Sequence, residues 1–196
     1  AMAPLDQVLS LWSGLGYYAR ARNLHKTAIL VHRDFRGRLP RSVAGLSALP
    51  GIGRSTAGAI MSFSQGQRAV ILDGNVKRVL ARHSAVEGWP GQKRIHDVLW
   101  AIAAERLPLR DAAIYNQGLM DLGSIICTRS TPLCDQCPLA RECAAYAQQQ
   151  QHLYPGKKPK SKERRKEKTH MLIIQNKVGH ILLAKRPNKG IWGGLW

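Results

Sequence analysis

The stretch LPGIGRSTAGAIMSFSQGQRAVILDGNVKRVLAR, residues 49–82, decides the fold of this chain. It begins with a glycine-rich turn at residues 49–53, and an Ala- and Gly-rich segment then predicts a helix starting at residues 55–62. Apolar residues at three-residue spacing over residues 43–49 predict a second helix before the turn. The stretch therefore predicts two helices joined by a tight hairpin.

The hairpin has two possible roles. Gly51 and Gly53 allow close approach to its backbone. Amide groups at such a turn, at the positive end of a helix, suit a phosphate oxygen better than a base edge. The same residues also fit an ordinary helix-helix corner in which glycine is the C-cap. The basic composition of the chain favours the phosphate interpretation.

One carboxylate follows the hairpin by about twenty residues. After an apolar run at residues 69–72, Asp73, Gly74 and Asn75 predict a helix N-cap, with the helix continuing over residues 76–83. An aspartate at an N-cap is often only a cap. Near a helix start a carboxylate stays ionised, and it can then stabilise a cationic sugar while a base is lost, as in glycoside hydrolysis.

Charge points to the partner. The 196 residues carry 30 Lys and Arg against 12 Asp and Glu, a net charge of +18, and residues 151–196 hold 12 of these cations against 2 acids. Such a surplus predicts a polyanion partner, with a membrane surface as the weaker alternative and a solvated basic tail at residues 157–168 as the plainest one. The chain shows no run of eighteen apolar residues and no signal peptide, so we expect a cytoplasmic bacterial protein without a membrane partner.

Ahead of the hairpin, residues 4–15 and 22–35 read as helices separated by GLGYYARARNL. Tyr17 and Arg20 lie in this break. Aromatic rings beside arginines can pack in a core, or can wedge a duplex open while holding its phosphates. The chain opens in the middle of a helical pattern, and we interpret it as a fragment.

Further helical patterns cover residues 92–106 and 112–126, and four cysteines follow. In a cytosolic chain such a cluster argues for a metal rather than disulfides. Zinc and an iron-sulfur cluster both take four thiolates, and the spacing alone does not choose. The metal could staple a basic loop that contains Arg129 and Arg141. The gaps of six, two and five residues separate Cys127, Cys134, Cys137 and Cys143.

Three separated motifs carry a family resemblance: LPGIGRSTAGAI, VILDGNVKRVLAR and the four-cysteine loop. Together they resemble the helix-hairpin-helix superfamily of base-excision DNA glycosylases, which implies a mostly α fold. GLGYYARARNL, NQGLMDLGSIICT and YPGKKPK resemble the MutY-type adenine DNA glycosylases in particular, over residues 4–160.

This resemblance implies the roles of individual residues. It implies a [4Fe-4S] cluster on the four cysteines, Asp73 as the catalytic carboxylate and Asn75 as the residue that helps place it. Tyr17 resembles the wedge at the lesion, and the amides around Gly51 and Gly53 would hold a phosphate, often through a monovalent cation. The expected DNA contacts are Tyr17, Arg20, Gly51, Gly53, Ser55 and Lys77.

Position 55 separates the branches of the family. Bifunctional relatives such as endonuclease III carry a lysine there, which attacks the sugar C1′. This chain has Ser55 and therefore resembles the monofunctional branch, in which water completes hydrolysis. Lys77 could form an adventitious imine, but we do not assign it the chemistry.

The implied reaction removes adenine mispaired with 8-oxoguanine or guanine in double-stranded DNA. The adenine is flipped out of the stack, and Asp73 stabilises the oxocarbenium-like sugar. The family's acid is a glutamate on a helix ahead of the segment that starts here, and acid catalysis of this kind is worth about 100 to 10,000-fold. The alternatives are a catalytically incomplete DNA-binding fragment and a glycosylase of different base specificity.

We divide the chain into a glycosylase domain (residues 1–150), a basic linker (residues 151–168) and a truncated domain (residues 169–196). Strands are predicted at residues 170–175 and 180–184 around a turn. They resemble the opening of the family's α+β Nudix-like domain, which recognises 8-oxoguanine. Two strands alone are marginal in water, so a flexible tail is the alternative. We expect a monomer.

Overall fold

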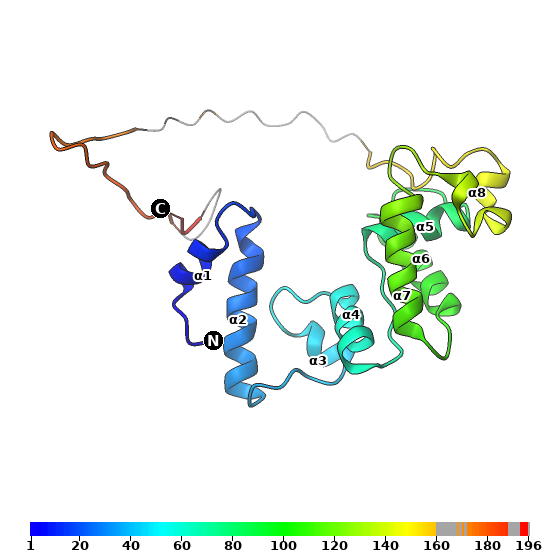
Figure 1. Ribbon diagram of the computed structural model, residues 1–196, viewed down its shortest axis with the longest axis horizontal. Coiled ribbons are helices and arrows are strands. Elements are labelled where there is room, and N and C mark those ends of the chain that lie inside the picture. The colour runs from blue at the N-terminus through cyan, green and yellow to red at the C-terminus, as the bar shows by residue number, and fades with distance from the viewer. Residues whose placement is uncertain (160–167, 169, 171, 188–192, 196) are drawn as a thin grey trace.

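The chain folds as a series of helices, seen here in a computed structural model that describes residues 1–159, 168, 170, 172–187 and 193–195. In Figure 1, α1 and α2 lie at one end, α3 and α4 in the middle, and α5 to α8 at the other end. The elements are α1 (Leu5–Leu11), α2 (Tyr18–Asp34), α3 (Val43–Ser47), α4 (Arg54–Gln65), α5 (Gly74–His83), α6 (Lys93–Arg106), α7 (Ala112–Asp121), η1 (Leu122–Ile126), η2 (Cys134–Gln136), η3 (Ala140–Glu142) and α8 (Ala144–Ala147). The predicted mostly α fold is confirmed.

The predicted hairpin is present. Ser42 caps α3 by accepting a hydrogen bond from the Gly45 N–H at 3.0 Å. Gly51 adopts a φ of +78°, which favours glycine. Gly53 is then the N-cap of α4 in an extended conformation. The ends of two helices therefore meet at a turn that requires glycine at position 51.

Two apolar cores hold the helices. The first joins the buried face of α2 to the hairpin and α4, and contains Val31, Leu46, Leu49, Ala57, Met61 and Ala69. The second lies among α5, α6 and α7, where Leu72, Val76, Leu80, Leu99 and Leu119 are buried together. The hairpin and the start of α5 thus lie on separate cores, linked by residues 66–73.

This linking segment is fixed tightly against α4. A Cβ on Gly58 would lie 2.1 Å from the Val70 carbonyl oxygen, so only glycine allows the approach. From α7, the buried Asn116 amide donates to the Ser62 hydroxyl at 3.1 Å and to the Ala69 carbonyl at 2.9 Å. The position of Asp73, which follows, is therefore set by α4 and α7.

Several helix boundaries differ from those predicted. Helix α1 ends at Leu11 rather than residue 15, and α2 begins at Tyr18 rather than residue 22. Gly14 and Gly16 both have positive φ, so the chain turns sharply between these helices. The pattern at residues 112–126 divides into α7 and the π-helical η1.

The C-terminal strands are a correction. Within the described residues, 170–187 contain a single antiparallel bridge, Gln175 to Ile181, around the predicted turn, and no extended strand. Leu172, Ile173 and Leu183 remain exposed, because two short segments without a third strand cannot bury their apolar faces. Positions 169, 171, 188–192 and 196 lie outside the described residues, and the Nudix-like assignment stays a prediction.

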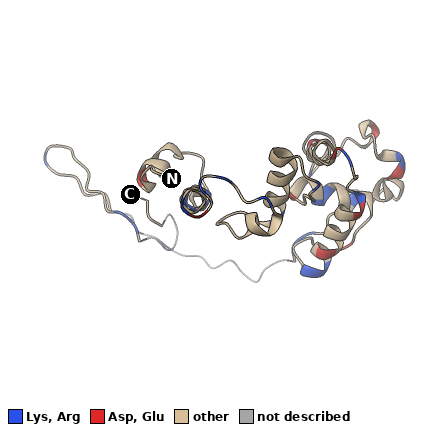
Figure 2. Ribbon diagram, turned by 90° about the horizontal axis from the view of Figure 1, so that it is seen from below, with Lys and Arg blue, Asp and Glu red and all other residues tan. Residues whose placement is uncertain are grey.

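The start of the predicted linker belongs to the helical body. The Gly156 N–H donates to the Gly88 carbonyl at 3.1 Å, and the Arg82 Nε donates to the Tyr154 carbonyl at 3.0 Å. Figure 2 shows Lys and Arg distributed over the helical part of the chain as well. Among the described helices, none is both long enough and apolar enough to span a membrane.

Candidate nucleic-acid interface and four-cysteine loop

Asp73 begins α5. Its Oδ1 accepts a hydrogen bond from the Val76 N–H at 2.8 Å, so the predicted N-cap is confirmed. The side chain is half-buried. Just before it, the Leu72 N–H donates to the Ser55 hydroxyl at 3.0 Å. Ser55 therefore fixes the turn that carries Asp73, and a DNA contact from this side chain stays a prediction.

Asn75 is connected to the cysteine loop through one arginine. Arg78 Nη2 donates to the Asn75 Oδ1 at 2.8 Å, and its Nε donates to the Cys127 carbonyl at 2.8 Å. Burial lowers the pKa of Arg78, and the neighbouring Cys127 opposes this shift. The close approach of Gly123 to Asn75, where a Cβ would lie 2.7 Å from that of Asn75, lets η1 pack here. The start of α5 and the first cysteine are thus held together.

Arg82, one turn further along α5, is 3% exposed and organises the rest of the loop. Its donors reach the Gln151 and Tyr154 carbonyls at 3.0 Å, the Thr128 carbonyl at 2.6 Å and the Arg129 carbonyl at 3.1 Å. It also lies 3.3 Å from the Cys127 sulfur. This guanidinium satisfies the carbonyls of two chain segments that have no regular secondary structure to pair with.

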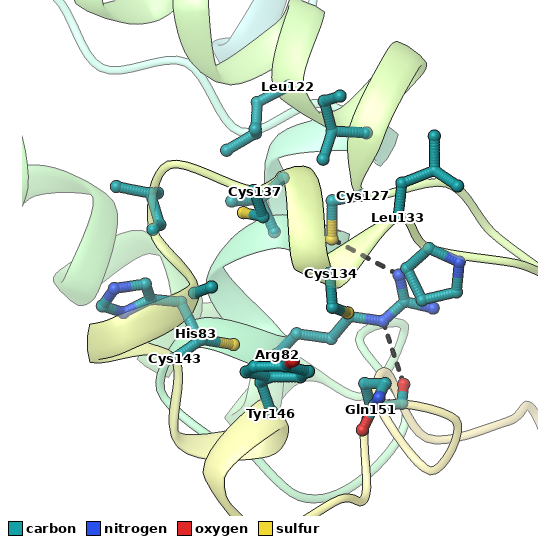
Figure 3. A pocket seen from close by; sticks show the side chains of 15 residues that line it. Arg82, His83, Leu122, Cys127, Leu133, Cys134, Cys137, Cys143, Tyr146 and Gln151 are labelled. Atoms are coloured by element: carbon teal, nitrogen blue, oxygen red, sulfur yellow. Dashed lines mark hydrogen bonds between the residues drawn. The ribbon is translucent and has the colours of Figure 1, made fainter.

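The four cysteines line one cavity (Figure 3). Its other walls are largely apolar and include Val79, Leu122 and Leu133, with Arg82 reaching in from α5. Burial raises the pKa of the Cys134 and Cys137 thiols. Within the described residues, no three His, Cys, Asp or Glu side chains converge tightly enough for a single metal ion. The four thiols nevertheless line one common space.

Helix α2 packs against the hairpin. The Thr27 hydroxyl donates to the Pro50 carbonyl at 2.8 Å, and a Cβ on Gly51 would lie 2.7 Å from that of Asn23. Gly53 is exposed, with open space around its Cα. The first amides of α4, which have no partner within the helix, follow directly after it.

Tyr17 is the N-cap residue of α2, at the end of the helical series away from the cysteine loop (Figure 1). It adopts a left-handed φ of 47° and is 83% exposed, so it does not pack in a core. The Arg20 guanidinium lies 5.9 Å from its ring centroid and 5.5 Å from that of Trp12. The Trp12 indole N–H donates to the Gly16 carbonyl at 3.0 Å. The ring is thus held outward by a short stack.

Apart from Ser55 and the four cysteines, the sequence-predicted site residues therefore form three groups. Asp73, Asn75 and Lys77 share the first turn of α5, the glycines share the hairpin, and Tyr17 with Arg20 begins α2. Sequence reasoning missed Arg78 and Arg82. Their four-residue spacing in VKRVLAR, on one face of a predicted helix, was the available signal. It also missed Arg54, whose guanidinium lies 3.9 Å from the Trp100 ring.

A glycine hairpin, a capped aspartate and a cysteine loop in this order define a class of DNA repair protein. The chain belongs to the HhH-GPD superfamily of base excision DNA repair proteins, whose family model matches residues 1–105. It is 44% identical over 99% of its length to an adenine DNA glycosylase of Buchnera aphidicola, and 33% identical over its whole length to the human adenine DNA glycosylase. It spans 54% and 44% of those relatives.

Solved structures agree with this assignment. A thermostable thymine-DNA glycosylase matches with a TM-score of 0.66 and 30% identity, covering 74% of this chain and 67% of that one. A non-covalent endonuclease III-DNA complex matches with a TM-score of 0.64 and 26% identity, covering 75% and 67%. The helical fold is that of enzymes whose structures include DNA complexes.

Proposed function

We propose that this chain is part of a monofunctional adenine DNA glycosylase. It removes adenine opposite 8-oxoguanine or guanine by hydrolysis of the N-glycosyl bond. The observation that carries the proposal is the turn at Asp73: the carboxylate is fixed at the start of α5 while Ser55, where bifunctional relatives carry lysine, is occupied in supporting that turn. The adenine glycosylase relatives support the choice of base.

Asp73 acts through its charge. One of its oxygens accepts the Val76 N–H, so the carboxylate has a set orientation before DNA arrives. The flipped adenosine then places its C1′ near this carboxylate, where positive charge develops as the base leaves. A preorganised charge of this kind lowers the activation barrier by several kcal/mol. Water completes the reaction, and a glutamate on a preceding helix protonates the adenine, as the family resemblance implies.

We propose that Cys127, Cys134, Cys137 and Cys143 hold a [4Fe-4S] cluster. The thiolates of such a cluster bind separate irons, so their sulfurs stand apart around it, whereas a tetrahedral zinc needs all four sulfurs about 2.3 Å from one ion. All four cysteines line one largely apolar cavity, which supports a common metal site, and the family resemblance implies the cluster rather than zinc. When bound, it would supply a rigid staple for the loop, and Arg82 would place that staple against α5.

In this proposal the hairpin glycines and the pair Tyr17 and Arg20 bind the DNA duplex. The amides near Gly51 and Gly53 would hold a backbone phosphate, with a monovalent cation as a bridge. Tyr17 would enter the duplex beside the lesion, with Arg20, Ser55 and Lys77 near the DNA strand. We further propose that the protein acts as a monomer on double-stranded DNA that contains an adenine mispair.

A single-turnover assay tests this function, with protein that also contains the preceding helix. We expect release of free adenine from an 8-oxoguanine·adenine duplex, no release from adenine·thymine, and an intact strand until alkali is added. Release of a different base would contradict the specificity. Strand cleavage without alkali would contradict the monofunctional assignment, and DNA binding without base release would support the non-catalytic alternative.

A further inference from the structure

A basic cavity lies beside the start of α5, and apart from Lys77, already expected near the DNA, its lining cations contact no DNA in the mechanism above. Four segments contribute to it: α5 from Gly74 to Arg82, the turn at Trp89 and Pro90, Arg129 of the cysteine loop, and residues 152–158, called the strap below. No Asp or Glu is among the described residues that line it. The cationic side chains that line it are Lys77, Arg78, Arg82, Arg129, Lys157 and Lys158, and the His152 side chain lies among them.

The strap is held in place by specific contacts. A Cβ on Gly156 would lie 2.6 Å from the Gly88 backbone, so this residue allows two chain segments to touch. The Gly156 N–H donates to the Gly88 carbonyl, and Arg82 binds the Tyr154 carbonyl. The Lys158 ammonium lies 5.5 Å from the Trp89 ring centroid. The strap's lysines are therefore placed over the cavity by packing.

We propose that this cavity binds a phosphodiester group of the DNA backbone next to the nucleotide that loses its base. Cations gathered in one hollow repel one another, and an anion in the hollow relieves that repulsion. Arginine and lysine together suit phosphate, by paired hydrogen bonds and by point charge. Gly74, which lines the cavity, follows Asp73 directly, so a phosphate here would fix the sugar relative to that carboxylate.

The inference rests on the proposed function only in taking DNA as the polyanion. It adds a second phosphate site. At the hairpin the contacts come from backbone amides, whereas in the cavity they come from Lys and Arg side chains. It also gives the strap a function, because residues 152–158 contribute part of the wall of the cavity.

Salt dependence of binding tests the cavity directly. Neutralising one phosphate contributes about 0.9 to the slope of log affinity against log salt. With undamaged duplex, the double variant Lys157→Ala/Lys158→Ala should show a slope smaller by about 0.9, or roughly threefold less affinity lost between 50 and 200 mM salt. The control, Lys26→Ala/Lys177→Ala, removes the same charge from exposed positions outside the cavity. Equal slopes for the two variants would overturn the proposal.

A substitution that keeps every charge provides the second test. Gly156→Ala should displace the strap and lower the slope as the lysine variants do, because the new Cβ meets the Gly88 backbone. Gly118→Ala, in α7 with nothing within 4 Å of its Cβ position, is the matched control. Melting curves exclude unfolding. Wild-type salt dependence in a Gly156→Ala protein whose strap is shown by amide exchange to be displaced would contradict the role of the strap.

Neutral methylphosphonate linkages identify the phosphate. Placed one at a time around the adenine, one linkage should weaken binding by wild-type protein and have no effect on the Lys157→Ala/Lys158→Ala variant, since neighbours in contact are coupled. Were no linkage coupled to these lysines, the cavity would not hold a DNA phosphate. Binding is the readout throughout, so loss of adenine release alone would contradict the proposed function and leave the cavity standing.

Discussion

The hairpin and the four-cysteine loop are both irregular, but different forces fix them. Backbone geometry sets the hairpin: a glycine with positive φ, a short cap and one hydroxyl from α2. The loop at residues 127–154 depends instead on two long side chains of α5, which satisfy its carbonyls. Damage to the hairpin should therefore lower DNA binding with a local cost in stability, whereas damage to the loop should also affect folding of the loop and the position of Asp73.

The largest effect is expected for the cysteines. Cys134→Ser should abolish the brown colour of anaerobically purified protein and unfold the loop, because the binding energy of such a site is also folding energy. Iron analysis, visible absorbance and amide exchange over residues 127–154 measure this, with exchange in α3 and α4 unchanged. A colourless wild-type protein with one stoichiometric zinc would refute the cluster.

The second-largest effect is expected for Arg82→Ala, which should destabilise the cysteine loop. The substitution leaves buried carbonyls without a donor, and we expect a loss of roughly 3–5 kcal/mol in the free energy of unfolding. Arg94→Ala, at an exposed position on α6, is the control and should change stability little. Denaturant unfolding measures both. A similar stability for the two variants would mean that Arg82 does not hold the loop.

On the hairpin side, Gly51→Ala should weaken binding to matched and mispaired duplexes alike. Alanine is strained at a φ of +78° and its Cβ would meet Asn23, at a cost of about 1–3 kcal/mol. Gly53→Ala has room in the protein, so any effect of it reports a close phosphate. Fluorescence anisotropy with both duplexes measures these changes, and a change confined to the mispair would contradict a general phosphate contact.

Tyr17→Ala should have the smallest effect on stability and should act on mispaired duplex alone. Stacking of one aromatic ring on a base is worth about 1–3 kcal/mol. Because the ring is exposed, its removal leaves the melting curve unchanged. Tyr17→Phe keeps the ring and should bind normally. Equal losses on matched and mispaired DNA would end the wedge assignment.

Sequence reasoning succeeded where the structure depends on neighbours in the chain. The hairpin and the Asp73 cap follow from local residue choice, and both are confirmed. It failed where partners are distant: the spacing of Arg78 and Arg82 places them on one helix face, but it does not indicate that Arg82 binds a carbonyl 72 residues away. It also predicted strands at residues 170–175 and 180–184, because short apolar runs on both sides of a turn indicate strands but not the neighbouring strands that they require.

The central claim is that Asp73 acts as a charge and not only as a cap. Asp73→Asn, in protein that includes the preceding helix, keeps the size of the side chain and can still accept the Val76 N–H. Its melting curve should stay near wild type. Single-turnover release of adenine from an 8-oxoguanine mispair should fall by roughly a hundredfold or more, since each 1.36 kcal/mol is a factor of ten. Normal release by a well-folded Asp73→Asn protein would contradict the account.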